Sequence, residues 1–171
     1  MRKGGGKQKG ASFEREICVK LSSWLSNGTQ EDVFWRSAMS GGRATVAHKN
    51  HGKRLSSQVG DISCIHPVGN KFISTFAPEC KFYANLDFQG LITGKGKLLT
   101  FWAEINKQAN QHNKYPFMIA KQNRMPVVIC LSHIGLNALG LGPQHTVLIS
   151  RPFDLYIVDA DRFFEVTIPY V

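Results

Sequence analysis

The sequence predicts a mixed α/β domain, and two kinds of pattern lead to this fold class. Residues 12–25 and 98–113 carry apolar side chains at helical spacing. Short runs rich in β-branched and aromatic residues lie between and after these two segments. Because the order is helix, strands, helix, strands, we expect a central mixed β-sheet flanked by α-helices.

The first predicted helix, residues 12–25, places one acid among its apolar side chains. Ser12 is a plausible N-cap, and Asn27-Gly28 is a plausible end of the helix. At 100° per residue, Glu14 falls inside the apolar stripe, whereas Glu16 falls on the opposite side. A carboxylate that faces a core is costly unless it has a partner. The stripe consists of Phe13, Ile17, Cys18, Leu21, Trp24 and Leu25.

The remaining elements follow from the same patterns. The predicted strands are residues 32–37, 59–65, 71–83, 115–120, 125–131, 145–150 and 155–159. A turn at residues 66–70 joins the strands 59–65 and 71–83, which allows the two to pair as a hairpin. Residues 41–58 read as a long basic loop and 85–97 as an irregular insertion. The apolar residues 155–171 either complete the core or contribute to a dimer interface.

Composition indicates a globular protein that binds a polyanion. The chain has 171 residues, 43% hydrophobic and 19% charged, which fits one domain. Its net charge is +9, and nucleic acid is the commonest partner of so basic a protein, although a basic surface also serves solubility. We expect residues 1–10 to form a flexible basic arm and residues 11–171 to form one domain.

The chain shows no apolar run of the ~20 residues that a membrane helix needs, and no hydrophobic signal region. Four cysteines are widely spaced in apolar surroundings without a CxxC pair, so buried reduced thiols are expected. These observations predict a cytoplasmic protein. Two histidines, His48 and His51, lack further ligands at zinc spacing.

Acidic residues at three distant places in the sequence form the candidate site. Glu79 and Lys81 lie two apart in a predicted strand and therefore project from the same face. Asp61 interrupts an apolar strand, where Asp is disfavoured. If the two strands pair, Asp61 and Glu79 meet, and Glu14 approaches from the first helix. Taken alone, Glu79 with Lys81 could be a solvated ion pair, and Asp61 a turn residue.

Carboxylates converging with a lysine have a specific chemistry. Hard divalent cations such as Mg²⁺ take oxygen ligands and keep several waters. Such an ion polarises a phosphodiester and lowers the pKa of an attacking water. A lysine beside it orients that water or neutralises the charge of the transition state.

In this order the motifs resemble the PD-(D/E)xK nucleases, and within them the Holliday junction resolvases of the archaeal and phage type. The matching segments are KGASFEREI (9–17), WRSAMSGG (35–42), VGDIS (59–63), ECK (79–81) and KYPFMIAKQNRMPVVI (114–129). One departure is Gly60, because members of the family often carry Pro before the Asp.

The resemblance implies a restriction-endonuclease-like core, Mg²⁺ or Mn²⁺ as cofactor, four-way DNA junctions as substrate and a homodimer. The implied metal ligands are Asp61, Glu79, the backbone carbonyl of Cys80 and Glu14, and Lys81 is the implied catalytic lysine. Contacts to DNA are expected from Lys9, Arg15, Arg36, Ser40, Arg43, Lys53 and Arg54. Two alternatives stay open: a restriction-like, repair or flap nuclease with the same core, and a non-catalytic basic DNA-binding module.

Overall fold

The computed structural model describes residues 5–37 and 60–167 of the chain, with side chains from Gln8 onward. The elements in chain order are α1 (Gly5–Leu25), β1 (Phe34–Arg36), β2 (Ile62–Cys64), α3 (Asn70–Thr75), β3 (Phe76–Tyr83), α4 (Gly90–Thr93), α5 (Lys97–Gln111), β4 (Tyr115–Gln122), β5 (Val127–Leu131), α6 (His133–Ala138), β6 (Leu148–Ser150), β7 (Leu155–Asp159) and α7 (Ala160–Val166). Of the residues predicted to contact DNA, Ser40, Arg43, Lys53 and Arg54 lie outside the described residues.

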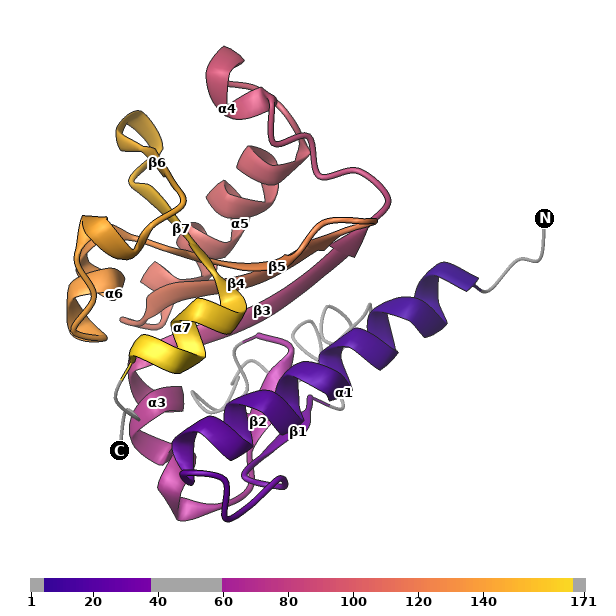
Figure 1. Ribbon diagram of the computed structural model, residues 1–171, viewed down its shortest axis with the longest axis vertical. Helices are drawn as coiled ribbons and strands as arrows, with labels where there is room; N and C mark the ends of the chain where they lie inside the picture. Colours follow the sequence, from indigo (N-terminus) through magenta and orange to yellow (C-terminus); the bar gives the residue numbers. More distant parts are fainter. Residues whose placement is uncertain (1–4, 38–59, 168–171) are drawn as a thin grey trace.

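A five-stranded mixed sheet in the order β3-β4-β5-β7-β6 forms the centre of the fold, with helices on both sides (Figure 1). Strands β3 and β4 are parallel, and the other neighbours are antiparallel. The parallel pair requires a crossover, which α5 provides between β3 and β4. This architecture confirms the predicted α/β class and places β3 at one edge of the sheet.

Each face of the sheet builds its own core because side chains alternate along the strands. Phe76, Cys80, Phe117 and Ile119 face the cluster formed with α1, α3 and α7. Their neighbours Met118 and Ala120 face the cluster that contains Leu98, Leu99, Trp102 and Ile105 of α5. The odd-numbered residues of β3 therefore lie on the side of α5, and the even-numbered residues lie on the side of α1.

Residues 59–65 and 71–83 do not pair as a hairpin. Strand β2 pairs with β1, and β3 pairs with β4. Residues 70–75 form helix α3 because Phe72 and Ile73, although adjacent, are both buried, and a strand would turn them to opposite faces. Phe72 contacts the rings of Trp24, Phe34, Phe76 and Phe117.

Helix α1 begins at Gly5 rather than at Ser12. Residues 5–10, expected to belong to a flexible arm, are therefore its first turns. Tertiary contacts explain the extension, since Lys9 donates a hydrogen bond to Asn123 in the β4–β5 turn and its ammonium lies 3.8 Å from the centre of the Phe82 ring. Such contacts outweigh the weak helix propensity of glycine.

The C-terminal segment completes the core within the described residues. Strand β7 pairs with both β5 and β6, and Phe163 of α7 is fully buried against Trp24 and Phe117. The four cysteines are free thiols, and all but the half-buried Cys64 are buried. Within residues 5–37 and 60–167, no helix has both the length and the apolar character that crossing a membrane requires.

Candidate active site

The candidate site is built on the outer edge of β3, where Asp61 attaches to the strand. The backbone N–H of Asp61 donates to the carbonyl of Pro78 at 3.0 Å. The backbone N–H of Cys80 donates to Oδ2 of Asp61, also at 3.0 Å. Asp61 therefore meets the strand that carries Glu79 and Lys81, although the two segments do not form a hairpin.

Gly60 makes this attachment possible. Its φ of +94° lies in the left-handed region, which side chains disfavour. A Cβ atom at this position would lie 2.1 Å from the carbonyl oxygen of Pro78, so only glycine allows the two backbones to approach so closely. The same approach brings the Asp61 N–H to Pro78.

Glu79 and Lys81 project from the opposite face of β3 to Cys80, as their spacing predicts. Lys81 Nζ lies 2.7 Å from Oε1 of Glu79, and both side chains are largely buried. Burial acts to lower the pKa of Lys81, whereas the carboxylates of Glu79 and Asp61 act to raise it. The effect of the carboxylates is the larger, so the pKa of Lys81 is raised overall. Lys81 is therefore a persistent ammonium in this arrangement, with its charge directed at the carboxylates.

Glu14 reaches the site from α1, on the other face of the sheet. Its side chain is only 14% exposed and is paired with Nε of Arg36, the last residue of β1. The predicted burial of a carboxylate in the apolar stripe is thus observed, and Arg36 supplies a partner. Arg36, predicted as a DNA contact, pairs with Glu14 while remaining one-third exposed.

The electrostatics of the site converge on Asp61. Burial raises the pKa of this carboxyl to about 7, and the charges of Glu79 and Glu14 act in the same direction. The hydrogen bond from the Cys80 N–H and the charge of Lys81 oppose the shift. Burial and neighbouring carboxylates thus disfavour the charged form of Asp61. A positive ion bound beside these carboxylates would stabilise that form.

These groups line one cavity of about 600 Å³. It contains Glu14, Asp61, Glu79 and Lys81, so residues separated by up to 67 positions in the sequence (from 14 to 81) share one concave site. The remaining lining residues are Lys9, Gly10, Cys80, Phe82, Tyr83 and Ala84.

The donor set suits a hard divalent cation. The backbone N–H and C=O groups of one strand residue point to the same edge of the strand. The Cys80 carbonyl therefore points to the same edge as the Cys80 N–H, which donates to Asp61. Two carboxylates and a carbonyl are the ligands that Mg²⁺ takes, with waters completing the shell. Within the described part of the chain, no group of three or more His, Cys, Asp or Glu side chains is already gathered as a metal site.

Other predicted residues lie at different distances from this cavity. Lys9 lines it, whereas Arg15 lines a separate cavity of about 190 Å³ beside Trp35. Three residues that the sequence analysis did not select lie close to the site: Phe82, Tyr83 and Lys121. Phe82 and Tyr83 directly follow the Glu-x-Lys motif, which is a signal that could have identified them.

A family model described as "Phage putative PDDEXK endonuclease" matches residues 5–164. The chain belongs to this family. Membership supports the PD-(D/E)xK superfamily, a restriction-endonuclease-like fold and a nuclease that acts on DNA. No curated protein and no solved structure matches the chain.

Substitution of Gly60 by Ala tests the close approach of the Gly60-Asp61 segment to β3. We expect G60A to lose about 1–3 kcal/mol of unfolding free energy, because a non-glycine residue is strained here and its Cβ meets Pro78. Chemical denaturation measures the loss. The matched control is G28A, since Gly28 has φ +79° but no atom within 4 Å of the added Cβ. Equal losses in the two variants would contradict a role for the Pro78 contact.

Substitution of Asp61 by Asn is expected to stabilise the metal-free protein at pH 8. The folded-state pKa of about 7 exceeds the ordinary 3.8, so the carboxyl's favourable contribution is present at low pH and is lost as pH rises through about 7. The amide oxygen can still accept from the Cys80 N–H. We expect D61N to be more stable than the parent by on the order of 2 kcal/mol at pH 8.

Thermal unfolding in EDTA at pH 5 and pH 8 measures this difference. The advantage of D61N should shrink at pH 5, where the parent Asp61 is protonated. D161N is the control, since the Asp161 side chain is 81% exposed and should show no such pH dependence. A D61N variant less stable than the parent at pH 8 would refute the proposed charge crowding.

Proposed function

We propose that the protein is a metal-dependent DNA endonuclease whose catalytic residues are Asp61, Glu79, Lys81 and Glu14. The observation that carries the proposal is the attachment of Asp61 to β3 through Pro78 and Cys80. This attachment places the Asp of one segment beside the Glu-x-Lys of another, and both line the same cavity. The family match supports nuclease chemistry for this fold.

In this proposal Asp61, Glu79 and the Cys80 carbonyl hold Mg²⁺ or Mn²⁺. The bound ion supplies Lewis-acid polarisation of the phosphodiester and a lowered pKa for an attacking water. Asp61 is ready for the role because burial and its acidic neighbours destabilise its charge, so cation binding is coupled to proton release near neutral pH. The Cys80 N–H fixes one carboxylate oxygen and thereby orients the other.

Lys81 neutralises negative charge at the reacting phosphate. Its ammonium is held within 2.7 Å of Glu79 and lies 5.2 Å from the centre of the Phe101 ring, so its position is restricted from two sides. A positioned ammonium stabilises charge that develops in a transition state without reorganisation of solvent. Glu14, which Arg36 holds in the same cavity, completes the metal site directly or through a bound water.

The DNA backbone is held by basic residues around the site. Lys9 lines the catalytic cavity, and Arg15 and Arg36 lie on the neighbouring α1 and β1. We assign the same role to Ser40, Arg43, Lys53 and Arg54 from their place in the sequence. With a net charge of +9, binding should weaken steeply with salt as counterions are released.

Branched DNA, and the four-way junction in particular, is the substrate we place first. The support is the ordered resemblance of residues 9–17, 35–42, 59–63 and 79–81 to junction resolvases. Symmetric cleavage of a junction needs two active sites related by a two-fold axis, so this substrate entails a homodimer. A restriction-like, repair or flap nuclease with the same four catalytic residues is the alternative.

Cleavage assays with Asp61→Asn test the catalytic assignment. We expect the parent to cut DNA only with Mg²⁺ or Mn²⁺, and D61N to be slower by on the order of 10² or more, the cost of removing one electrostatic stabiliser. Gel assays of end-labelled DNA measure the rates, and D161N is the control that keeps its activity. Intact cleavage by D61N would show that the catalytic residues are assigned wrongly, whereas no cleavage by the parent would leave a non-catalytic DNA-binding module as the better description.

A substrate panel tests the preference for junctions. Four-way junction, linear duplex, flap and single-stranded DNA of equal length are cut side by side under identical salt and metal. We expect paired nicks on opposite strands of the junction at the highest rate. Faster cleavage of linear duplex, with Asp61 still required, would exclude junction resolution while keeping the nuclease assignment.

A further inference from the structure

The carboxyl end of β3 carries two aromatic side chains that point to opposite faces of the sheet. Phe82 packs on the side of α1, where its ring lies 5.4 Å from that of Phe13. Tyr83 lies on the side of α5, where its ring is 4.9 Å from that of Phe101. Both rings line the catalytic cavity or its rim, directly after the Glu-x-Lys segment.

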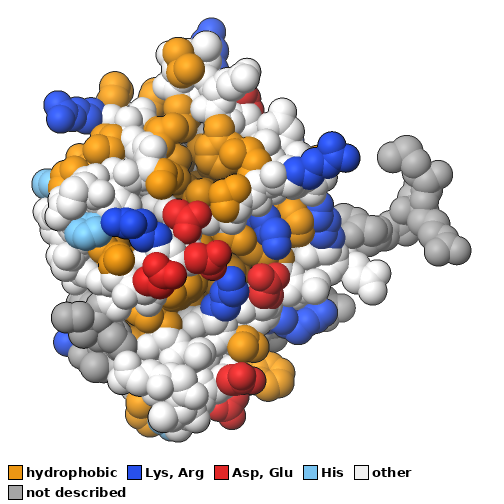
Figure 2. Space-filling view, in the orientation of Figure 1, with side chains coloured by type: hydrophobic (Ala, Val, Ile, Leu, Met, Phe, Trp, Pro, Cys, Tyr) orange, Lys and Arg blue, Asp and Glu red, His pale blue; other side chains and the backbone are white. Residues whose placement is uncertain are grey.

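Two lysines gather at the Phe82 ring. The ammonium of Lys9 lies 3.8 Å from the ring centre, and that of Lys121, at the end of β4, lies 5.2 Å away. Two like charges at one ring repel each other, so this arrangement favours an anion between or beside them. Figure 2 shows Lys and Arg side chains on the right-hand side of this face.

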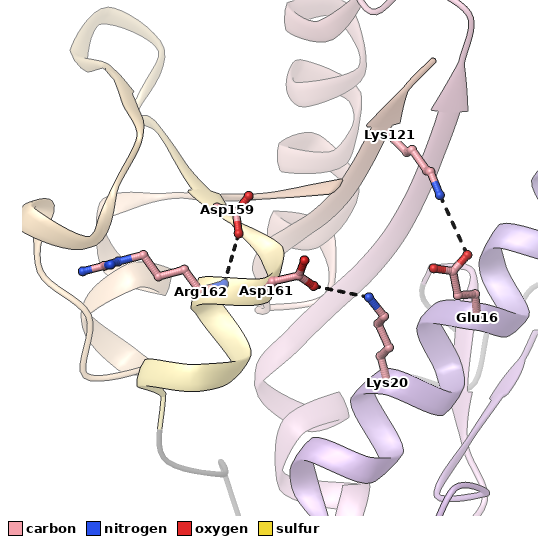
Figure 3. A network of polar contacts seen from close by, with 6 residues as sticks. All are labelled: Glu16, Lys20, Lys121, Asp159, Asp161 and Arg162. Carbon is pink, nitrogen blue, oxygen red and sulfur yellow. Dashed lines mark hydrogen bonds and ion pairs between the residues drawn. The ribbon is translucent and has the colours of Figure 1, made fainter. Parts of the chain in front are cut away.

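Neutralisation of Lys121 within the protein is weak. Its ammonium lies 3.9 Å from the carboxylate of Glu16, whose side chain is 46% exposed (Figure 3). An ion pair of such length and exposure contributes little and is easily exchanged for another anion. Lys9 interacts with the neutral amide of Asn123. This pair of lysines therefore keeps most of its positive charge available.

A third lysine stands on the other side of β3. Lys97 is the first residue of α5 and is exposed, and its ammonium lies 5.0 Å from the centre of the Tyr83 ring. The positive end of the helix dipole adds to its charge. Cation–π contacts restrict these side chains and so lower the entropy that each loses when it binds a phosphate.

The basic positions are continuous with the candidate active site. Lys9 and Phe82 line both the catalytic cavity and a second cavity of about 390 Å³ formed with Gln8, Ser12, Phe13 and Glu16. Tyr83 lines the catalytic cavity from the other side. A DNA strand that crosses the carboxyl end of β3 at the catalytic residues would thus meet a lysine side chain on each side of β3.

We propose that Lys121 and Lys97 bind DNA backbone phosphates on the two sides of the catalytic cavity and so set the path of the DNA across the carboxyl end of β3. This inference deepens the proposed function and depends on it, because it assigns phosphate-contacting residues to the same site. The bound chemistry is the phosphodiester of nucleic acid, and base identity is not read by these lysines.

The test is the salt dependence of DNA binding, measured in EDTA so that cleavage does not interfere. Fluorescence anisotropy with a labelled duplex and a labelled four-way junction gives the Kd at KCl concentrations of about 50 to 300 mM. Counterion release should change the affinity several-fold over this range of salt. The variants are K121Q, K97Q, the double variant and the charge-preserving K121R.

K20Q is the matched control. Lys20 lies on the same helix as Glu16, pairs with Asp161 at 3.4 Å and is 40% exposed, so it resembles Lys121 in exposure and pairing (Figure 3). Unlike Lys9, it lines neither the catalytic cavity nor the cavity of about 390 Å³. Loss of general positive charge should affect K20Q and K121Q alike, whereas loss of a phosphate contact should affect only K121Q. Circular dichroism and thermal unfolding check that each variant is folded.

We expect K121Q and K97Q each to raise Kd by about 3–10-fold at 100 mM salt and to reduce the slope of log K against log salt by about 1. In the double variant this slope should fall by about twice as much as in either single variant, because the two lysines contact separate phosphates. K121R should keep the parent slope. Equal effects of K20Q and K121Q, or slopes unchanged in K121Q and K97Q, would overturn the proposed path.

Failure of this inference is distinguishable from failure of the proposed function. Unchanged salt slopes together with metal-dependent cleavage that requires Asp61 would reject the path and keep the nuclease. Reduced slopes in a protein that cuts no DNA would keep the path and reject the catalytic assignment.

Discussion

The candidate site depends on one attachment, that of Asp61 to the outer edge of β3. Its backbone N–H binds the Pro78 carbonyl, its carboxylate accepts from the Cys80 N–H, and its own carbonyl accepts from the N–H of Ser37 at 2.7 Å. The last bond ties the end of β1 to the same residue. Through Asp61, the two-stranded β1–β2 sheet is joined to the five-stranded sheet, and the acids of two chain segments come together.

The same attachment explains why the site is electrostatically costly. A buried carboxyl beside Glu79 and Glu14 resists ionisation, and this is why its pKa rises to about 7. The protein partly compensates with the Cys80 N–H and Lys81, while Arg36 pairs with Glu14. What remains is the cost of ionising Asp61 in a concave site, a cost that the cation we propose would relieve. Functional sites often carry such a cost.

The sequence predicts the directions in which the side chains of the site point better than it predicts the topology that brings them together. The alternation of Glu79, Cys80 and Lys81 follows from strand geometry, and the helical position of Glu14 follows from the 100° period, so both are visible locally. The pairing of Asp61 with β3 was expected for an incorrect reason, a hairpin. Residues 70–75 form a helix because Phe72 and Ile73 pack in one tertiary core, and no local propensity records that packing. The early start of α1 likewise depends on Phe82 and Asn123, which are distant in the sequence.

The edge position of β3 unites the structural and functional observations. An edge strand exposes backbone groups on one side, which proteins usually cover or charge. Here the Gly60-Asp61 segment covers Pro78 and Cys80, and the Cys80 carbonyl remains directed to the site. Because consecutive side chains alternate, the same strand presents Phe82 to α1 and Tyr83 to α5, each with lysine beside it. An interior strand would be flanked by neighbours on both edges, so it could offer neither the carbonyl that we propose as a metal ligand nor the approach that we propose for DNA.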